Sequence, residues 1–515
     1  MDADSSIQQL FNKTPSKLTP KKRMTPSKFG SANKLRTFNS PSYHFKPPVF
    51  EFPKVEEPET SVVDDEISQN YFNRKNLGEV LASYNPDLMD LDSAENTKFL
   101  KFEIVEDKLT EQYRYMNPKI GEVSEALEYQ NQLMLEKIEG VKQEFKLVDP
   151  NAISQEIVTT LGRICFDDEL TNGEEVQMTD DTVMIEPFQS MGNGERVHLD
   201  LSYLKSYCLT PGQIVYCEGQ NFNGTKFTVN KFLPISELKF EESSSQGSLE
   251  QTSVWVSSGP YTLESNLKYE PFQTLINQLE SNCPNSMIIM GPFVSETHPL
   301  IAKGDTTSTP QELFQNYIGQ PLNSLASKYP KTQFFLVPSP DDLIQNYLTL
   351  PQPAFQSKLS LRILEPNVHL LSNPAELKLE DKLFSFANFE TVIPLVKSQF
   401  KKEIKSNGIE EGLELILNQQ NLYPLFPVYL DNIQIHYPLY HQLNLTNKPN
   451  FIITNSKLAP FIKNIKGTIF INTGSYSKFN QGGSLCKISL HPSIKEESAS
   501  ELDWSKDVKV EIVKS

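Results

Sequence analysis

The first residues that could take part in chemistry are hydroxyl groups placed directly before proline. Thr-Pro-x-Lys occurs three times within fifteen residues and a Ser-Pro pair follows; the acceptors are Thr14, Thr19, Thr25 and Ser40. Proline keeps the residue before it extended, and cell-cycle kinases favour a basic residue two positions after the proline. The pattern therefore predicts a phosphorylated segment, although Thr-Pro and Lys are also common in tails that are simply disordered.

A short basic cluster lies among these acceptors, formed by Lys21, Lys22 and Arg23. It could serve nuclear import or contact phosphate, or it could be a solvated run of charge. Residues 1–50 hold nine Lys and Arg and two Asp, which is +7, so the other 465 residues carry −24 of the total −17. Each phosphate would add about −1.5 to −2 charges, so three could nearly cancel the charge of this arm.

A second set of candidate positions follows short apolar runs in the C-terminal half. A two-metal phosphoesterase needs a bridging carboxylate with His and Asp ligands in such loops. Here Pro292 stands where the bridging Asp is required and Ser295 stands where the second Asp is required. We interpret the loops as degenerate, and their residues are Ser258, Gly259, Pro260, Gly291, Pro292, Ser295, Asp341, Asp342, His369 and Asn373.

Other chemistries lack their residues as well. His298 and His369 remain, but two His without partner carboxylates cannot hold a binuclear centre, so we interpret both as structural. The five Cys contain no CxxC, and no nucleotide-binding GxxxxGK[ST] or GxGxxG, hydrolase GxSxG or zinc-binding HExxH motif is present. We therefore expect no catalytic residue, no cofactor and no metal ligand, and we predict that the chain is not an enzyme.

The elements that hold these residues follow from composition and periodicity. Residues 1–105 are predicted to be a disordered basic tail and an acidic linker, and residues 106–150 to be one amphipathic helix. Residues 151–240 contain short strands and Gly-containing turns, typical of a small barrel. Residues 250–515 alternate continuous apolar strands with helices, among them 270–280, 311–327 and 388–420, as in an α/β fold.

The barrel could in principle bind a single nucleic-acid strand. Such binding needs exposed aromatic side chains beside Lys and Arg, but the predicted loops carry acidic pairs, including Asp167-Asp168 and Glu174-Glu175. The acidic body is repelled by nucleic acid and by anionic membrane. We therefore favour a barrel that docks on protein, and no apolar run is long enough to cross a membrane.

This combination resembles the family of accessory (B) subunits of eukaryotic DNA polymerase alpha–primase, and its fungal members in particular. Each motif is weak alone, but their order and spacing over about residues 110–490 are specific. The residues that carry the resemblance are Tyr113-Arg114-Tyr115-Met116, Pro211-Gly212-Gln213, Gly219-Gln220-Asn221, Ser258-Gly259-Pro260-Tyr261-Thr262, Gly291-Pro292-Phe293-Val294, His369-Leu370-Leu371-Ser372-Asn373-Pro374, Tyr423-Pro424-Leu425-Phe426-Pro427 and Gly482-Gly483.

The resemblance implies an oligonucleotide-binding (OB) barrel packed on an inactive calcineurin-like phosphoesterase domain. It also implies a non-catalytic nuclear subunit that clamps the zinc-containing C-terminal domain of the catalytic polymerase subunit and meets the primase subunits through the complex. The complex would make primers for DNA replication and at telomeres, where telomere-capping proteins are possible partners, and its contact with DNA through this subunit would be mainly indirect. A cyclin-dependent kinase would act on the tail.

Three departures from the family pattern and several alternatives stay open. Ser295 and the loop Ser339-Pro340-Asp341-Asp342 are atypical, and the N-terminal region is short for the separate helical domain of some members. The chain could instead be an accessory subunit of polymerase delta or epsilon, which share the same plan. An active metallophosphoesterase with relocated ligands and a free single-strand-binding protein are further alternatives.

Overall fold

The computed structural model describes residues 62–89, 100–105, 118–139, 147–166, 177–192, 194–241, 251–428, 433–492 and 504–515. All of them belong to one compact unit, Thr60–Ser515. The predicted phosphoacceptors, the basic cluster and the Tyr113–Met116 motif lie outside the described residues. No helix in the described part of the chain is long and apolar enough to cross a membrane.

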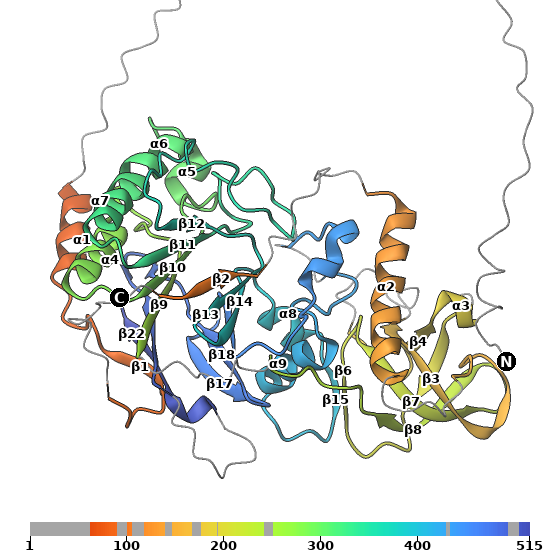
Figure 1. The fold of residues 1–515 in the computed structure, drawn as a ribbon. Helices are drawn as coiled ribbons and strands as arrows, with labels where there is room; N and C mark the ends of the chain where they lie inside the picture. The colour runs from red at the N-terminus through yellow and green to blue at the C-terminus, as the bar shows by residue number, and fades with distance from the viewer. Residues whose placement is uncertain are drawn as a thin grey trace, which may run out of the picture. The chain divides into compact units, whose positions relative to one another are not determined.

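A seven-stranded sheet forms the first layer of the α/β part (Figure 1). Its central strands are parallel and wholly buried, as expected for continuous apolar runs. Across the sheet the strands are β1 (Val80–Tyr84), β22 (Val508–Lys514), β21 (Ser484–Leu490), β9 (Thr252–Ser258), β10 (Ser286–Met290), β11 (Gln333–Val337) and β12 (Val368–Leu370).

A six-stranded sheet packs on one face of the first. Ile288 and Met290 of β10 face Phe384 and Phe451 of this second sheet in one apolar core, whereas Met287 and its neighbours pack under helices on the opposite face. The central strands are therefore covered on both sides. In order the second sheet contains β17 (Phe461–Ile465), β18 (Thr468–Asn472), β16 (Phe451–Thr454), β14 (Lys382–Ala387), β13 (Ala375–Leu379) and β2 (Phe102–Ile104).

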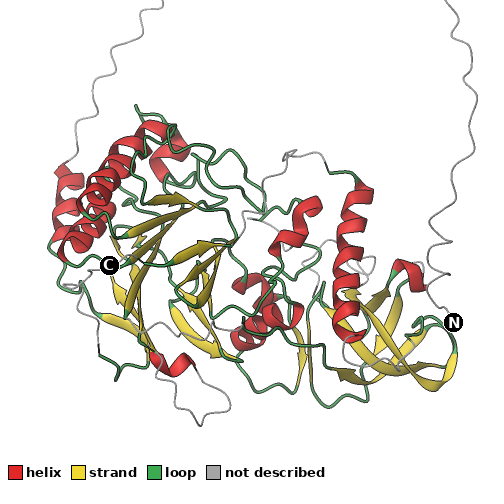
Figure 2. Cartoon of the chain, in the orientation of Figure 1, coloured by secondary structure: helices red, strands yellow, loops and turns green. Residues whose placement is uncertain are grey.

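Helices cover the outer faces of the two sheets (Figure 2). Apolar residues of α4 and α7 pack on the first sheet, and those of α8 and α9 pack near the second. The predicted helix over 388–420 is in fact two helices with a short strand between them. The elements are α4 (Glu270–Ser281), α5 (Pro299–Lys303), α6 (Pro310–Phe314), the π-helix η3 (Gln315–Gly319), α7 (Gln320–Lys328), α8 (Val392–Lys397), β15 (Phe400–Lys402), α9 (Gly408–Gln419), η4 (Tyr437–Leu443), β19 (Ser477–Lys478), β20 (Gln481–Gly482) and η5 (Trp504–Asp507).

The segment expected to be a linker over 61–105 is folded wherever the structure describes it. It contains α1 (Val62–Phe72) and the strands β1 and β2, which pair with β22 and β13 at the sheet edges. The prediction was wrong here because edge strands of three and five residues are specified by backbone pairing more than by alternation. Leu100, which precedes β2, is buried in the core between the sheets.

A closed five-stranded barrel forms between residues 154 and 233, as the sequence predicted. Its β5 and β8 pair in parallel and every other pair is antiparallel. The register of β7 against β8 shifts between Glu218 and Gly219, and a glycine within a strand permits such an irregularity. The barrel strands are β3 (Ser154–Phe166), β4 (Val183–Pro187), β5 (Val197–Asp200), β7 (Ile214–Asn221) and β8 (Lys226–Leu233). The same region also contains α3 (Gln189–Gly192) and β6 (Tyr207–Leu209), which lie outside the barrel.

Helix α2 (Ile120–Glu139) precedes the barrel and begins later than the predicted residue 106. Met134 and Ile138 on its apolar stripe pack against Leu161, Ile214 and Tyr216 of the barrel. The helix is therefore a packed structural element along this stripe, as its periodicity indicated.

Candidate functional site

The carboxyl ends of β9, β10 and β11 lie side by side because these strands are parallel and in register. Their loops continue the ladder: the Gly259 N–H donates to Met290 O and the Gly291 N–H to Val337 O, both at 2.8 Å. Ligands and active sites of open α/β sheets lie at such an edge. The structure thus brings the loops that start at Ser258, Gly291 and Pro338 together.

The first loop is filled by its neighbours. The hydroxyl of Ser258 lies 2.7 Å from that of Thr473, and the Ser477 hydroxyl donates to Pro260 O at 3.0 Å. A Cβ atom on Gly259 would overlap the carbonyl oxygen of Pro292. The first loop is therefore closed by packing against the second loop and against the Thr473–Ser477 segment.

Asp342 is a fully buried carboxylate that joins the second and third loops. The Phe293 N–H donates to its Oδ2 at 2.8 Å and the Val294 N–H donates to its Oδ1 at 3.1 Å. Burial raises the pKa of Asp342 to about 7, against the opposing effect of these amides. Both carboxylate oxygens are thus used to shape the Gly291–Ser295 turn.

Asp341 and Ser295 are also held within these two loops. The Glu296 N–H donates to Asp341 O at 3.0 Å, and the hydroxyls of Ser295 and Thr297 are 2.9 Å apart. Burial raises the pKa of Asp341, while the ammonium of Lys457 lowers it. Asp341 also interacts with the carboxylate of Asp342, whose pKa it helps to raise.

Two buried asparagines connect loops that are distant in sequence. The Asn388 Nδ2 donates to Gly291 O at 3.1 Å and to Pro338 O at 2.9 Å, and its N–H donates to Asn373 Oδ1 at 3.0 Å. Asn373 Nδ2 in turn donates to Gln352 Oε1 at 3.0 Å. The sequence interpretation included Asn373 but missed Asn388, whose position directly after β14 was the available signal.

The two histidines have protein partners. His369 Nε2 lies 2.9 Å from Gln333 Oε1, and its ring stacks on Phe335 with centroids 5.0 Å apart. Burial is the main cause that lowers the pKa of His369 to about 4. His298 Nε2 lies 2.8 Å from Leu263 O, and its Nδ1 accepts from Leu300 N–H at the start of α5. His369 lies within β12 and not in the strand-end loops.

The described residues contain no group of three or more His, Cys, Asp or Glu that could hold a metal ion. Apart from His369, the candidates of the C-terminal half lie in loops that are hydrogen-bonded to one another. The polar groups in these loops are mainly amides, hydroxyls and the backbone of glycines. These groups suit hydrogen bonding between loops more than they suit coordination of a hard divalent cation.

A second feature is the joint between the barrel and the α/β part. Gln419, at the end of α9, accepts from Ile214 N–H at 2.8 Å and donates to Ile214 O at 2.9 Å. Gly212 of the Pro211-Gly212-Gln213 motif has φ +91°, and a Cβ there would overlap the backbone of Phe426. The glycine is required because the two parts approach at that turn, and β6 pairs with β15 beside it.

Buried Arg163 ties the barrel to α2 at the same joint. Its Nη2 donates to Leu127 O at 2.8 Å and to Asn131 Oδ1 at 3.1 Å, and its Nη1 donates to Gly212 O at 3.2 Å. Burial lowers the pKa of this guanidinium. Helix, barrel and turn are therefore fixed to one another by one side chain that the sequence analysis did not single out.

Two family models match this chain. The model for the B subunit of DNA polymerases alpha and epsilon matches residues 254–463, and the model for the OB domain of the DNA polymerase alpha B subunit matches residues 119–235. The first match covers the α/β part from β9 to β17, and the second covers α2 and the barrel.

Similar proteins from distant eukaryotes share one description, the B subunit of DNA polymerase alpha. The Schizosaccharomyces pombe protein is 27% identical over 403 residues, covering 74% of this chain and 68% of that protein. The Mus musculus protein is 28% identical over 438 residues, covering 82% and 70%. The Saccharomyces cerevisiae protein is 30% identical over 402 residues, covering 69% of this chain and 54% of that protein.

Both matches, one over α2 and the barrel and one over the α/β part, describe B subunits of DNA polymerases. Within this class the OB-domain match and the named relatives agree on one polymerase. The chain is therefore similar to the B subunits of DNA polymerase alpha.

Proposed function

We propose that this chain is the non-catalytic subunit of a DNA polymerase alpha–primase complex and acts as its scaffold. It binds the zinc-containing C-terminal domain of the catalytic subunit and reaches the primase subunits through the complex. The observation that carries the proposal is the strand-end edge, where Asp342 and Asn388 bond to neighbouring loops. Loops that are bonded to one another in this way favour a surface for protein contact, and the similarity to B subunits of DNA polymerase alpha names the complex.

The α/β part is, in this proposal, an inactive phosphoesterase-like domain. A two-metal site needs a carboxylate that bridges both ions, and the corresponding loop carries Pro292, which has no ligand atom in its side chain. Asp342 is the nearest buried carboxylate, but both of its oxygens accept backbone N–H groups of that loop. Restoring a site would require several simultaneous changes, because one carboxylate alone cannot hold two cations.

Contact with DNA through this subunit is mainly indirect. The barrel exposes two aromatic residues, Tyr203 and Phe222, but the chain outside residues 1–50 carries −24, which opposes binding of phosphate. The tail is the basic part, and we place phosphorylation by a cyclin-dependent kinase on Thr14, Thr19, Thr25 and Ser40. Action in the nucleus, with Lys21, Lys22 and Arg23 as the import or phosphate-contact patch, and contact with telomere-capping proteins belong to the same proposal.

Isolation of the chain from its native source tests the proposed assembly. We expect a stoichiometric complex with one large polymerase and two primase subunits. A monomer without these partners would contradict the proposal, and recovery with a delta or epsilon polymerase would favour the related assembly. Metal analysis of the purified chain separates the enzyme alternative: two equivalents of manganese or iron together with nuclease or phosphatase activity would overturn the inactive assignment.

A further inference from the structure

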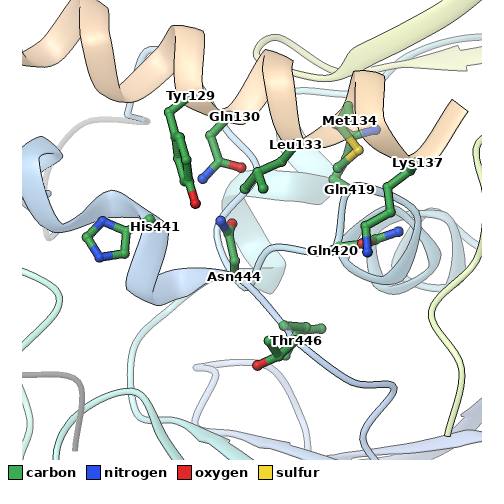
Figure 3. A pocket seen from close by; sticks show the side chains of 11 residues that line it. Tyr129, Gln130, Leu133, Met134, Lys137, Gln419, Gln420, His441, Asn444 and Thr446 are labelled. Carbon is green, nitrogen blue, oxygen red and sulfur yellow. The ribbon is translucent and has the colours of Figure 1, made fainter. Parts of the chain in front are cut away.

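A pocket of about 260 Å³ lies where α2, the end of α9 and η4 meet (Figure 3). It is separate from the strand-end loops and lies beside the joint between the barrel and the α/β part. In Figure 3 the side chains of Gln130 and Leu133 project from α2 toward Asn444. The lining residues that matter to the argument are Gln130, Leu133, Met134, Lys137, Asn444 and Leu445.

Gln130 is the unusual residue of this pocket. Its side chain is 4% exposed, and its Nε2 has no hydrogen-bond partner in the described part of the chain. The next residue, Asn131, is by contrast bonded to both Glu128 and Arg163. A buried donor without an acceptor destabilises a fold. An acceptor supplied from outside the chain would remove this cost.

Some of the other polar groups of the pocket already have hydrogen-bond partners within the chain, and others are available to a ligand. Gln419 and Gln420 are bonded to Ile214 and Ser236, and Asn444 Oδ1 accepts from Asn421. The ammonium of Lys137 has no carboxylate partner among the residues that the structure describes. The pocket therefore offers an amide donor and a cation, and Leu133, Met134 and Leu445 supply apolar wall.

We infer that this pocket is a docking socket for an extended segment of the catalytic polymerase subunit that presents a bulky apolar side chain next to a carboxylate. The apolar side chain of the segment occupies the space between α2 and Leu445. A backbone or carboxylate oxygen of the segment accepts a hydrogen bond from Gln130, and its carboxylate pairs with Lys137. A nucleic-acid strand fits less well, because the socket has one lysine and Glu128 and Glu136 lie on the same helix. This inference rests on the proposed function and adds the place and the chemistry of the contact.

The test compares Gln130→Leu with Gln132→Leu, the same change at an exposed position of the same helix. Each full-length chain is measured for thermal unfolding alone and for affinity to the purified full-length catalytic subunit. We expect Gln130→Leu to keep or raise the unfolding temperature, because the orphan donor is gone, and to weaken binding about tenfold, as for one lost hydrogen bond to a charged or buried acceptor. Gln132→Leu leaves both quantities unchanged.

Lys137→Met serves as a second variant that does not depend on the Gln130 site. It weakens binding several-fold at low salt and less at high salt, since a partly exposed ion pair is screened. Hydrogen exchange of α2 and of residues 441–446 slows when the catalytic subunit is added. Wild-type affinity of both pocket variants would overturn the socket and leave the proposed assembly intact. No binding by the wild-type chain would overturn both, and protection by an oligothymidylate strand in place of the polymerase would overturn the peptide assignment.

Discussion

At the scale of single residues, the strand-end loops show how carboxylates and amides can fill an edge where catalytic groups are common in other folds. Asp342, Asn373 and Asn388 join five segments of the chain through bonds of 2.8–3.1 Å. Each contact joins residues far apart in sequence. Substitutions here are therefore expected to act on the stability of the scaffold.

Asp342 gives a pH-dependent prediction. Its folded pKa, about 7, is above that of an exposed Asp, so the folded state binds a proton between about pH 4 and 7 that the unfolded state has released. The free energy of unfolding then falls with rising pH by up to about 1.4 kcal/mol per unit from this group. Asp342→Asn removes this contribution, which denaturation at pH 5 and pH 7.5 will show.

Asp305→Asn, at an exposed position, is the control for Asp342→Asn. As the pH rises, the free energy of unfolding of the wild type falls relative to that of Asp342→Asn, because only the wild type must ionise a buried carboxylate. The control shows no such shift. An equal difference for Asp342→Asn at the two pH values would contradict the raised pKa.

Gly259→Ala tests the contact between the first two loops. The new Cβ would overlap the backbone of Pro292, which cannot rotate away as a side chain can, so we expect a loss of about 3 kcal/mol or more of unfolding free energy. Gly121→Ala in α2 has nothing within 4 Å of its Cβ and should stabilise by about 0.5–1 kcal/mol. Chemical denaturation measures both, and a neutral Gly259→Ala would show that the loops can separate.

At the scale of elements, patterns along the chain predict strands and helices better than they predict edges and joints. The buried runs that became β9, β10, β11 and β16 were visible as continuous apolar segments, and the barrel was visible as short strands between glycine turns. Strands β1 and β2 were missed, because three to five residues at an edge have little periodic signal. The Asn388 contacts and the Arg163 joint were missed because they link distant segments.

Truncation tests the edge assignment. Removal of residues 1–59 leaves α1 and β1 in place, and we expect the unfolding midpoint of the remaining chain to stay within error of the full chain. Removal of residues 1–89 takes away β1, which exposes the edge of β22, and with it the Arg74 side chain that donates to Ser515 O at 3.0 Å. We expect a clear loss of stability on denaturation; equal midpoints for the two truncations would restore the linker interpretation.

At the scale of the whole molecule, charge divides the chain into a basic N-terminal segment and an acidic remainder. Residues 1–50 carry +7 and the other residues carry −24. Nucleic-acid affinity of the isolated chain should therefore depend on the tail. If the tail is phosphorylated as proposed, three phosphates would nearly cancel its charge.

Binding of single-stranded DNA tests this division. At low salt we expect the full chain to bind an oligothymidylate strand weakly, and removal of residues 1–59 to reduce that binding at least tenfold, because phosphate contacts supply most of the non-specific affinity. Fluorescence anisotropy over a salt series measures the effect. Salt-sensitive binding of equal strength by the truncated chain would assign the contact to the barrel.

The pairing of β1 with β22 also determines when the edge of this sheet can form during synthesis of the chain. Ala82 is opposite Ile512, so 430 residues separate the two partners. At about 5–20 residues per second of synthesis, the first of these strands waits roughly 20 to 85 s for the second. During that interval Val80 and Leu81 have no β22 to pair with. The nascent chain therefore folds correctly only if no other strand pairs with β1 before β22 is synthesised.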